Sequence, residues 1–189
     1  PTRCHLEGKI VSVLAQKVCV VGEFSVGKTS LIRRYVLGLF SEDYKATVGV
    51  NCYNHAGQFL HPETGVSHSI NLVLWDIEGG QQKSSMLNTY LLGAAGALMI
   101  ADVTRPETIA ALDHYYDLLE HVIPGRPKVF AINKIDRMDG SPALAQSLSF
   151  AQQKAKALGV KMVLTSAAEG NQVPELFGGL ASEMLRLRG

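Results

Sequence analysis

Cysteine, aromatic residues and an excess of either charge are all scarce in this sequence. Three cysteines among 189 residues, Cys4, Cys19 and Cys52, argue against a disulfide framework and against a zinc site. Eighteen basic residues against seventeen acidic ones give a net charge of +1, which leaves no global basic field for DNA or RNA. The longest apolar run, residues 93–101, is interrupted by Gly96 and is too short to span a bilayer. We therefore expect a cytoplasmic protein that does not bind nucleic acid.

What is present is the composition of a folded domain. Hydrophobic residues make up 47% of the chain and charged residues 19%, a balance that disfavours disorder. Apolar runs that are typical of strands buried on both faces alternate with helical patterns. The predicted strands are 17–21, 70–75, 97–103, 128–133 and 160–165. The predicted helices are 28–37, 86–92, 104–122, 142–158 and 174–187. This alternation predicts βαβ units in a three-layer α/β sandwich.

Two local features refine that prediction. The helix predicted at 104–122 opens with Thr104 and, three residues later, Glu107, which is the pattern of a capping box. Residues 48–61 and 66–77 both have the pattern of strands, and a short turn joins them. Two strands joined in this way form a hairpin, so we expect one edge strand to run antiparallel.

Residues 22–30 match the pattern G-x-x-x-x-G-K-[ST] in full, between a predicted strand and a predicted helix. Gly22 and Gly27 permit backbone angles that form a nest of N–H groups around an anion, and the helix N-terminus adds its positive dipole end. Lys28 would supply a charge to the terminal phosphates, and Thr29 a hydroxyl to Mg²⁺. The candidate residues of this loop are Glu23, Phe24, Ser25, Val26, Gly27, Lys28, Thr29 and Ser30. The motif predicts a nucleoside triphosphate but does not identify its base.

The base is indicated by Asn133-Lys134-Ile135-Asp136, at the carboxyl end of a predicted strand, where open α/β sheets bind ligands. The Asp136 carboxylate can accept hydrogen bonds from N1–H and the 2-amino group of guanine. Adenine would leave that carboxylate without a partner, which is a strong basis for discrimination. The Lys134 stem can lie flat over the base. These residues favour a guanine nucleotide.

These two motifs and three more, in order along the chain, resemble those of a Ras-superfamily small GTPase, with a likeness to the Rab branch, over residues 16–188. The other three are the first switch at 40–49, the metal and γ-phosphate motif at 75–79, and Thr165-Ser166-Ala167. The resemblance implies a P-loop G-domain over residues 16–189, after an N-terminal extension of uncertain structure at 1–15. It implies a mostly parallel six-stranded sheet of order 2-3-1-4-5-6, with about five helices around it.

The resemblance also implies roles for individual residues. Thr47 would bind Mg²⁺ and the γ-phosphate, Asp76 would hold Mg²⁺ through water, and the Gly79 amide would sense the γ-phosphate. Phe40 would pack against the base, and Tyr44 would close over the phosphates. With Thr29, the implied metal residues are therefore Thr29, Thr47 and Asp76.

For the base, the resemblance implies that the N–H groups of Ala167 and Ala168, beside Ser166, meet the guanine 6-oxo group. Ala168 stands where a lysine is common, which removes a contact but keeps the backbone amide. The residues implied in hydrolysis are Lys28, Thr47, Gly79 and Gln81.

Two positions depart from the family pattern. The residue after Gly79 is usually a glutamine that orients the attacking water, and here it is Gly80, followed by Gln81. Phe24 stands in the phosphate loop where a small residue is common. We therefore predict a Mg²⁺-dependent GTP/GDP switch with slow intrinsic hydrolysis. A pseudo-GTPase that binds GTP but hardly hydrolyses it stays open as the alternative. A P-loop kinase or ATPase fits less well, because it leaves Thr47 and Asp136 unexplained.

The resemblance implies partners as well. Effector, exchange-factor and GTPase-activating proteins would bind through residues 40–49 and 79–90, which GTP would order and GDP would release. The last residues, 185–189, contain no cysteine, so we expect no intrinsic lipid anchor. Recruitment to membranes would then depend on partners.

Overall fold

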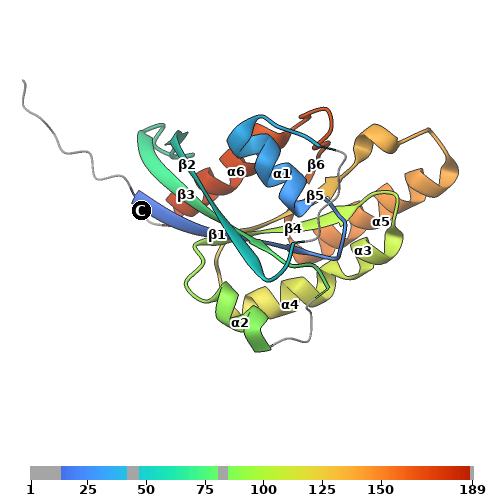
Figure 1. The fold of residues 1–189 in the computed structure, drawn as a ribbon, viewed down its shortest axis with the longest axis horizontal. Coiled ribbons are helices and arrows are strands. Elements are labelled where there is room, and N and C mark those ends of the chain that lie inside the picture. The colour runs from blue at the N-terminus through green and yellow to red at the C-terminus, as the bar shows by residue number, and fades with distance from the viewer. Residues whose placement is uncertain (1–13, 42–46, 81–84, 188–189) are drawn as a thin grey trace, which may run out of the picture.

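The computed structural model describes residues 14–41, 47–80 and 85–187. Its strands are β1 Leu14–Gly22, β2 Val50–Leu60, β3 Ser67–Ile77, β4 Gly96–Asp102, β5 Lys128–Asn133 and β6 Lys161–Leu164. Its helices are α1 Lys28–Leu37, α2 Ser85–Leu91, α3 Pro106–Ala110, α4 Leu112–Val122, the short 3₁₀ helix η1 Ile135–Arg137, α5 Pro142–Leu158 and α6 Val173–Arg186. Helices cover both faces of a central sheet (Figure 1), so the predicted three-layer α/β sandwich is confirmed.

Within the described ranges the sheet has six strands in the order β2-β3-β1-β4-β5-β6, as predicted. Only the pair β2–β3 is antiparallel, and it forms the predicted edge hairpin. Every residue of β4 and of β5 is buried, because helices cover both faces of these central strands. In the hairpin turn, His61 N–H donates to the Val66 carbonyl at 2.8 Å and Gly65 N–H to the His61 carbonyl at 2.9 Å.

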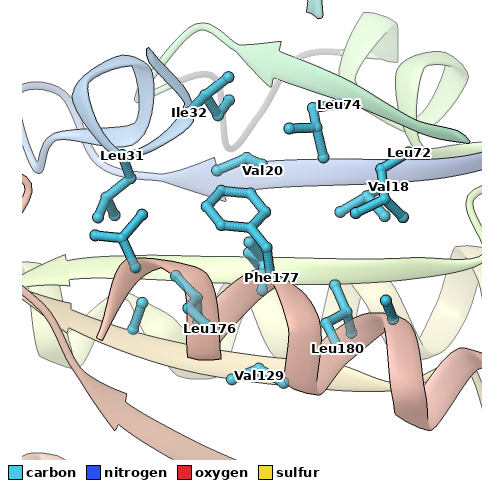
Figure 2. Close-up of a cluster of buried hydrophobic side chains, with 14 of the residues drawn as sticks. Val18, Val20, Leu31, Ile32, Leu72, Leu74, Val129, Leu176, Phe177 and Leu180 are labelled. Atoms are coloured by element: carbon cyan, nitrogen blue, oxygen red, sulfur yellow. The ribbon is translucent and has the colours of Figure 1, made fainter. Parts of the chain in front are cut away.

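Each face of the sheet carries its own hydrophobic cluster. On one face α1 and α6 pack on β1, and Phe177 of α6 points toward Val20 of β1 (Figure 2). The Phe177 ring also stacks on Tyr35 of α1, with 4.2 Å between ring centroids. On the other face, side chains of α2 to α5 form the second cluster. Among the helices described, none combines the length and the apolar character that a membrane crossing needs.

The prediction of one capped helix over residues 104–122 is wrong in two details. The helix is divided at Ala111, whose ψ of −16° tightens the turn toward 3₁₀ geometry between α3 and α4. The predicted capping box does not form either. Arg105 is the N-cap residue, and the Thr104 hydroxyl donates to the Asp102 carboxylate at 2.7 Å. Glu107 pairs with Arg105 at 2.9 Å. Both residues of the expected capping box are therefore bound to charged neighbours and not to each other's backbone.

Candidate functional site

Loops at one end of the sheet enclose a cavity of about 620 Å³. Its lining comes from segments far apart in sequence: the loop after β1, the start of α1, the chain between α1 and β2, and the loops that follow β3, β5 and β6. Predicted site residues in the lining are Phe24, Ser25, Gly27, Lys28, Thr29, Ser30, Phe40, Thr47, Gly79, Asn133, Lys134, Asp136, Ala167 and Ala168. Sequence reasoning missed four further lining residues, Arg33, Leu39, Ser41 and Arg137. The cavity therefore lies at the carboxyl ends of parallel strands, where open α/β sheets bind ligands.

The phosphate loop needs glycine at both ends. Gly22 has φ +146°, and a Cβ there would lie 2.2 Å from the carbonyl oxygen of Ile100. Gly27 has φ +99°, and a Cβ there would lie 2.3 Å from Nδ2 of Asn133. Gly27 is also the N-cap residue of α1 and provides no side-chain cap. The first turn of α1 thus keeps the backbone N–H groups and the dipole end that favour an anion.

The carbonyl oxygens of this loop are bound by donors at 2.8–2.9 Å. The pairs are Lys28 Nζ with Gly22 and Glu23, Arg105 Nη1 with Phe24, Lys134 Nζ with Ser25, Asn133 Nδ2 with Val26, and Leu31 N with Gly27. Three of the donors, on Lys28, Lys134 and Arg105, carry positive charge. The arrangement favours an anion, because the carbonyl oxygens that would repel it accept hydrogen bonds from these donors.

Lys28 is buried, with 6% of its surface exposed. Burial lowers its pKa to about 8, against the opposing influence of Asp76, Glu23 and Glu78. A phosphate in the cavity would compensate this buried charge. The side chain therefore lies where the sequence motif required a cation for the terminal phosphates.

The three predicted metal residues meet at the head of α1. Thr29 Oγ1 donates to Asp76 Oδ2 at 2.6 Å and lies 2.9 Å from Thr47 Oγ1. Burial raises the pKa of Asp76, although the hydrogen bond from Thr29 and the charge of Lys28 lower it in part. Among the described residues, the buried Asp76 Oδ1 has no hydrogen-bond partner. Two hydroxyls and a carboxylate oxygen without a donor are hard ligands that fit Mg²⁺ or its bound water.

The segments that end the first switch and begin the second are joined directly. Glu78 N–H donates to the Gly49 carbonyl at 2.9 Å, and Gly49 N–H donates to Glu78 Oε2 at 2.9 Å. A Cβ on Gly79 would lie 2.6 Å from the backbone nitrogen of Phe24, so Gly79 packs against the phosphate loop. Gly80 follows with φ +79° and is exposed.

Tyr115 of α4 also contacts both the phosphate loop and the start of the second switch. Its buried hydroxyl donates to Glu23 Oε1 at 3.3 Å. Burial and the Glu23 carboxylate raise the pKa of Tyr115, whereas a hydrogen bond from the Gly80 backbone lowers it. The structure thus places this tyrosine between the phosphate loop and the second switch.

Asn133 holds the loop that follows β6, which we call the base-side loop. Its Oδ1 accepts from Thr165 Oγ1 at 3.3 Å and from Ala167 N–H at 3.2 Å. Ser166 Oγ donates to Asp136 Oδ1 at 2.5 Å, which holds that carboxylate at the cavity wall. The contact of the Ala167 N–H with a guanine 6-oxo group stays a prediction; in this structure that N–H donates to Asn133 Oδ1. In the described part of the chain, the Ala168 N–H has no hydrogen-bond partner.

Several predicted site residues do not line the cavity: some are buried behind its wall, and others lie outside the described residues. The side chain of Val26 is fully buried in the core, and Ser166 and Asp76 are buried behind the wall. Tyr44 and Gln81 lie outside the described residues. Sequence reasoning missed Asp102, whose Oδ2 pairs with Lys134 at 2.6 Å. Asp102 ends β4 opposite Asn133, so the strand-end rule could have found it.

A comparison with known families agrees with this geometry. The model of the Ras family matches residues 17–186. The chain belongs to the Ras family. Members of this family bind GTP and GDP together with Mg²⁺ and use the γ-phosphate to order their switch segments.

Proteins of the Rab branch are among the relatives that this chain resembles, as the sequence predicted. Ras-related protein Rab-32 of Homo sapiens is 36% identical, over 72% of this chain and 61% of its own length. The GTP-binding nuclear protein GSP1 of Encephalitozoon cuniculi is 36% identical, over 65% of this chain and 56% of its own length. The Ypt/Rab-type GTPase ypt7 of Schizosaccharomyces pombe is 32% identical, over 87% of this chain and 80% of its own length. The chain thus spans 61% and 56% of the first two relatives.

Proposed function

We propose that this protein is a Mg²⁺-dependent GTP/GDP switch with slow intrinsic GTP hydrolysis. One observation carries the proposal: a single cavity is lined by the phosphate loop, by Thr29 and Thr47 with Asp76 bonded behind them, and by Asp136. Membership of the Ras family supports it. A kinase or an ATPase would not need Asp136, which is suited to binding guanine.

In this proposal each group has a defined task. Lys28 and the N–H groups of the phosphate loop hold the β- and γ-phosphates. Mg²⁺, held by Thr29, Thr47 and Asp76, would neutralise phosphate charge. Asp136 accepts from the N1–H and 2-amino groups of guanine. Because Thr47 lies at the end of the first switch and also contacts Thr29, loss of the γ-phosphate would weaken the hold on residues 40–49.

Effector, exchange-factor and GTPase-activating proteins would bind through residues 40–49 and 79–90. Exposed apolar side chains within these two segments support this surface, since Val48 is 83% and Met86 56% exposed. The contacts between Glu78 and Gly49 would let the two segments respond together. We place this action in the cytoplasm, with partners providing recruitment to membranes.

Slow hydrolysis is proposed because Gly80 has no side chain to orient water. Phe24 also lines the cavity, at a position of the phosphate loop where the family commonly has a small residue. If no partner and no neighbouring residue supplied the missing group, the protein would bind GTP and hardly hydrolyse it. That pseudo-GTPase is the second candidate, and a single-turnover assay separates the two.

The binding half of the proposal is tested by displacement of a fluorescent GDP. With Mg²⁺ present, unlabelled GTP and GDP should displace it, whereas ATP should not. Removal of Mg²⁺ with EDTA should accelerate nucleotide release, and Thr29→Asn should lower the affinity for GTP more than that for GDP. Equal competition by ATP and GTP would overturn the guanine assignment.

A further inference from the structure

Arg34, in the last turn of α1, binds the loop that follows β6. Its Nε donates to the Ala167 carbonyl at 2.8 Å, and its Nη2 donates to the Ala168 carbonyl. Its Nη1 donates to the Gly38 carbonyl at 3.3 Å, at the end of α1. The fork of one guanidinium therefore connects the phosphate-binding helix to the base-side loop.

The bond to Ala167 fixes the direction of the next amide. The Ala167 carbonyl and the Ala168 N–H belong to the same planar trans peptide, so they point in opposite directions. When Arg34 holds that carbonyl, the Ala168 N–H is turned away from α1. Both alanines line the cavity, and Ala168 is the one whose N–H has no partner in the described part of the chain.

We infer that Arg34 is a positioning residue that aims the Ala168 N–H at the 6-oxo group of guanine. This inference rests on the proposed function, because it assumes guanine in the cavity. Arg34 also lies 5.7 Å from the centre of the Phe40 ring, which is predicted to pack on the base. One side chain thus orders two base contacts from behind, without touching the nucleotide.

An arginine suits this task better than a lysine does. A guanidinium presents several donors in a rigid plane and can hold two adjacent carbonyls at once, whereas a lysine ammonium is a point charge on a flexible stem. The chain has Ala168 where the family commonly has lysine, so the base-side loop lacks the side-chain contact that would otherwise help to fix it. Arg34 compensates by holding the backbone of the same two residues.

The test compares the wild type with Arg34→Ala and Arg34→Lys for release of GDP, 6-thio-GDP and IDP. The compound 6-thio-GDP changes only the 6-position, and IDP lacks only the 2-amino group that Asp136 would bind. For Arg34→Ala we expect GDP release about tenfold faster, which corresponds to the loss of roughly one neutral hydrogen bond from the Ala168 N–H to the 6-oxo group. The preference for GDP over 6-thio-GDP should fall by a similar factor, and the preference for GDP over IDP should stay unchanged. Arg34→Lys should be intermediate.

The matched control is Arg186→Ala, which removes an arginine paired with Glu183 on the surface of α6 and should leave all three rates unchanged. Thermal unfolding reports whether each variant is folded, and Arg34→Lys decides the question if Arg34→Ala is not. Unchanged GDP release, or preferences over 6-thio-GDP and IDP that fall together, would overturn the role of Arg34. A wild-type protein that binds no GDP would instead overturn the proposed function.

Discussion

Nδ2 of Asn133 occupies the space that a side chain at Gly27 would need. The amide donates to the Val26 carbonyl at 2.9 Å, and a Cβ on Gly27 would lie 2.3 Å from the same nitrogen. The phosphate loop and the base motif are therefore packed against each other as one unit. Anything that displaces Asn133 also releases its bonds to Thr165 and Ala167 on the far side.

Gly27→Ala should abolish nucleotide binding and destabilise the protein. The substitution adds a clash with Asn133 to the cost of a positive φ, which is about 1–2 kcal/mol for a non-glycine residue. The matched control is Gly140→Ala, at φ +79° with no atom near its added Cβ, which carries the backbone cost alone. Thermal unfolding and GDP binding would be measured for both. Equal losses of stability in the two variants would contradict the packing argument.

Asp136→Asn should shift the base preference from guanine to xanthine. The amide oxygen can still accept from Ser166, while the new NH₂ group can donate to the 2-oxo group of xanthine. Competition of XDP and GDP for the fluorescent-nucleotide site measures the change. Asp139→Asn is the control, because Asp139 is a carboxylate of the next turn that bonds Ser141 and does not line the cavity. An Asp136→Asn variant that kept its guanine preference would remove Asp136 from the base site.

Cys19 should make the protein less stable at alkaline pH. Burial raises the pKa of this thiol from 9.0 to about 12. Above pH 9 the unfolded chain loses the thiol proton and the folded protein keeps it, so the unfolding free energy falls as pH rises toward 12. The slope from this group is about 1.4 kcal/mol per pH unit.

Denaturant unfolding between pH 9 and 10 measures this contribution, and comparison of the wild type with a cysteine variant removes the tyrosine titration that begins in the same range. Cys19→Ala should show a shallower decline than the wild type from a lower starting stability. Cys52→Ala, which removes an exposed thiol from the edge strand, should keep the wild-type slope. Coinciding slopes for wild type and Cys19→Ala would show that the buried thiol is not responsible.

The architecture was predictable because its signals are local. Unbroken apolar runs identified β4 and β5 as central strands, and a turn between two strand patterns identified the antiparallel edge. The division at Ala111 was not predictable, since alanine is a strong helix former and the change is one of backbone angle alone. The capping box failed because Asp102, at the end of the preceding strand, is a better partner for Thr104.

The residues of the site also divide into those that the sequence could predict and those that it could not. The residues of the phosphate loop and of the base motif are contiguous, so their spacing could be recognised in the sequence. Arg34, Arg105 and Tyr115 act on carbonyl or carboxylate groups that are distant in the chain. No local pattern distinguishes them from surface or packing residues, and only the fold brings them to their partners.

Intrinsic hydrolysis should be slow, and a glutamine at position 80 should accelerate it. An attacking water needs an acceptor and a donor that hold it in line with the γ-phosphorus, and Gly80 offers neither. A fully preorganised hydrogen bond in the transition state is worth roughly 10²–10³ in rate, and a switch loop without a partner would realise less. A Cβ on Gly80 has room, since its nearest neighbour is Glu23 Oε2 at 4.0 Å, but φ +79° makes any side chain there strained.

The measurement is a single-turnover rate for the wild type, Gly80→Gln, Gly80→Ala and Gln81→Ala. Gly80→Ala imposes the same backbone strain without an amide, so it isolates what the glutamine side chain contributes. We expect Gly80→Gln to be faster than the wild type, Gly80→Ala to be no faster, and Gln81→Ala to be nearly unchanged. The competing account is that Gln81 turns into the site, because glycine gives its neighbour unusual freedom. In that case Gln81→Ala would abolish hydrolysis, Gln81 would be the catalytic glutamine, and the deficiency inferred from Gly80 would not exist.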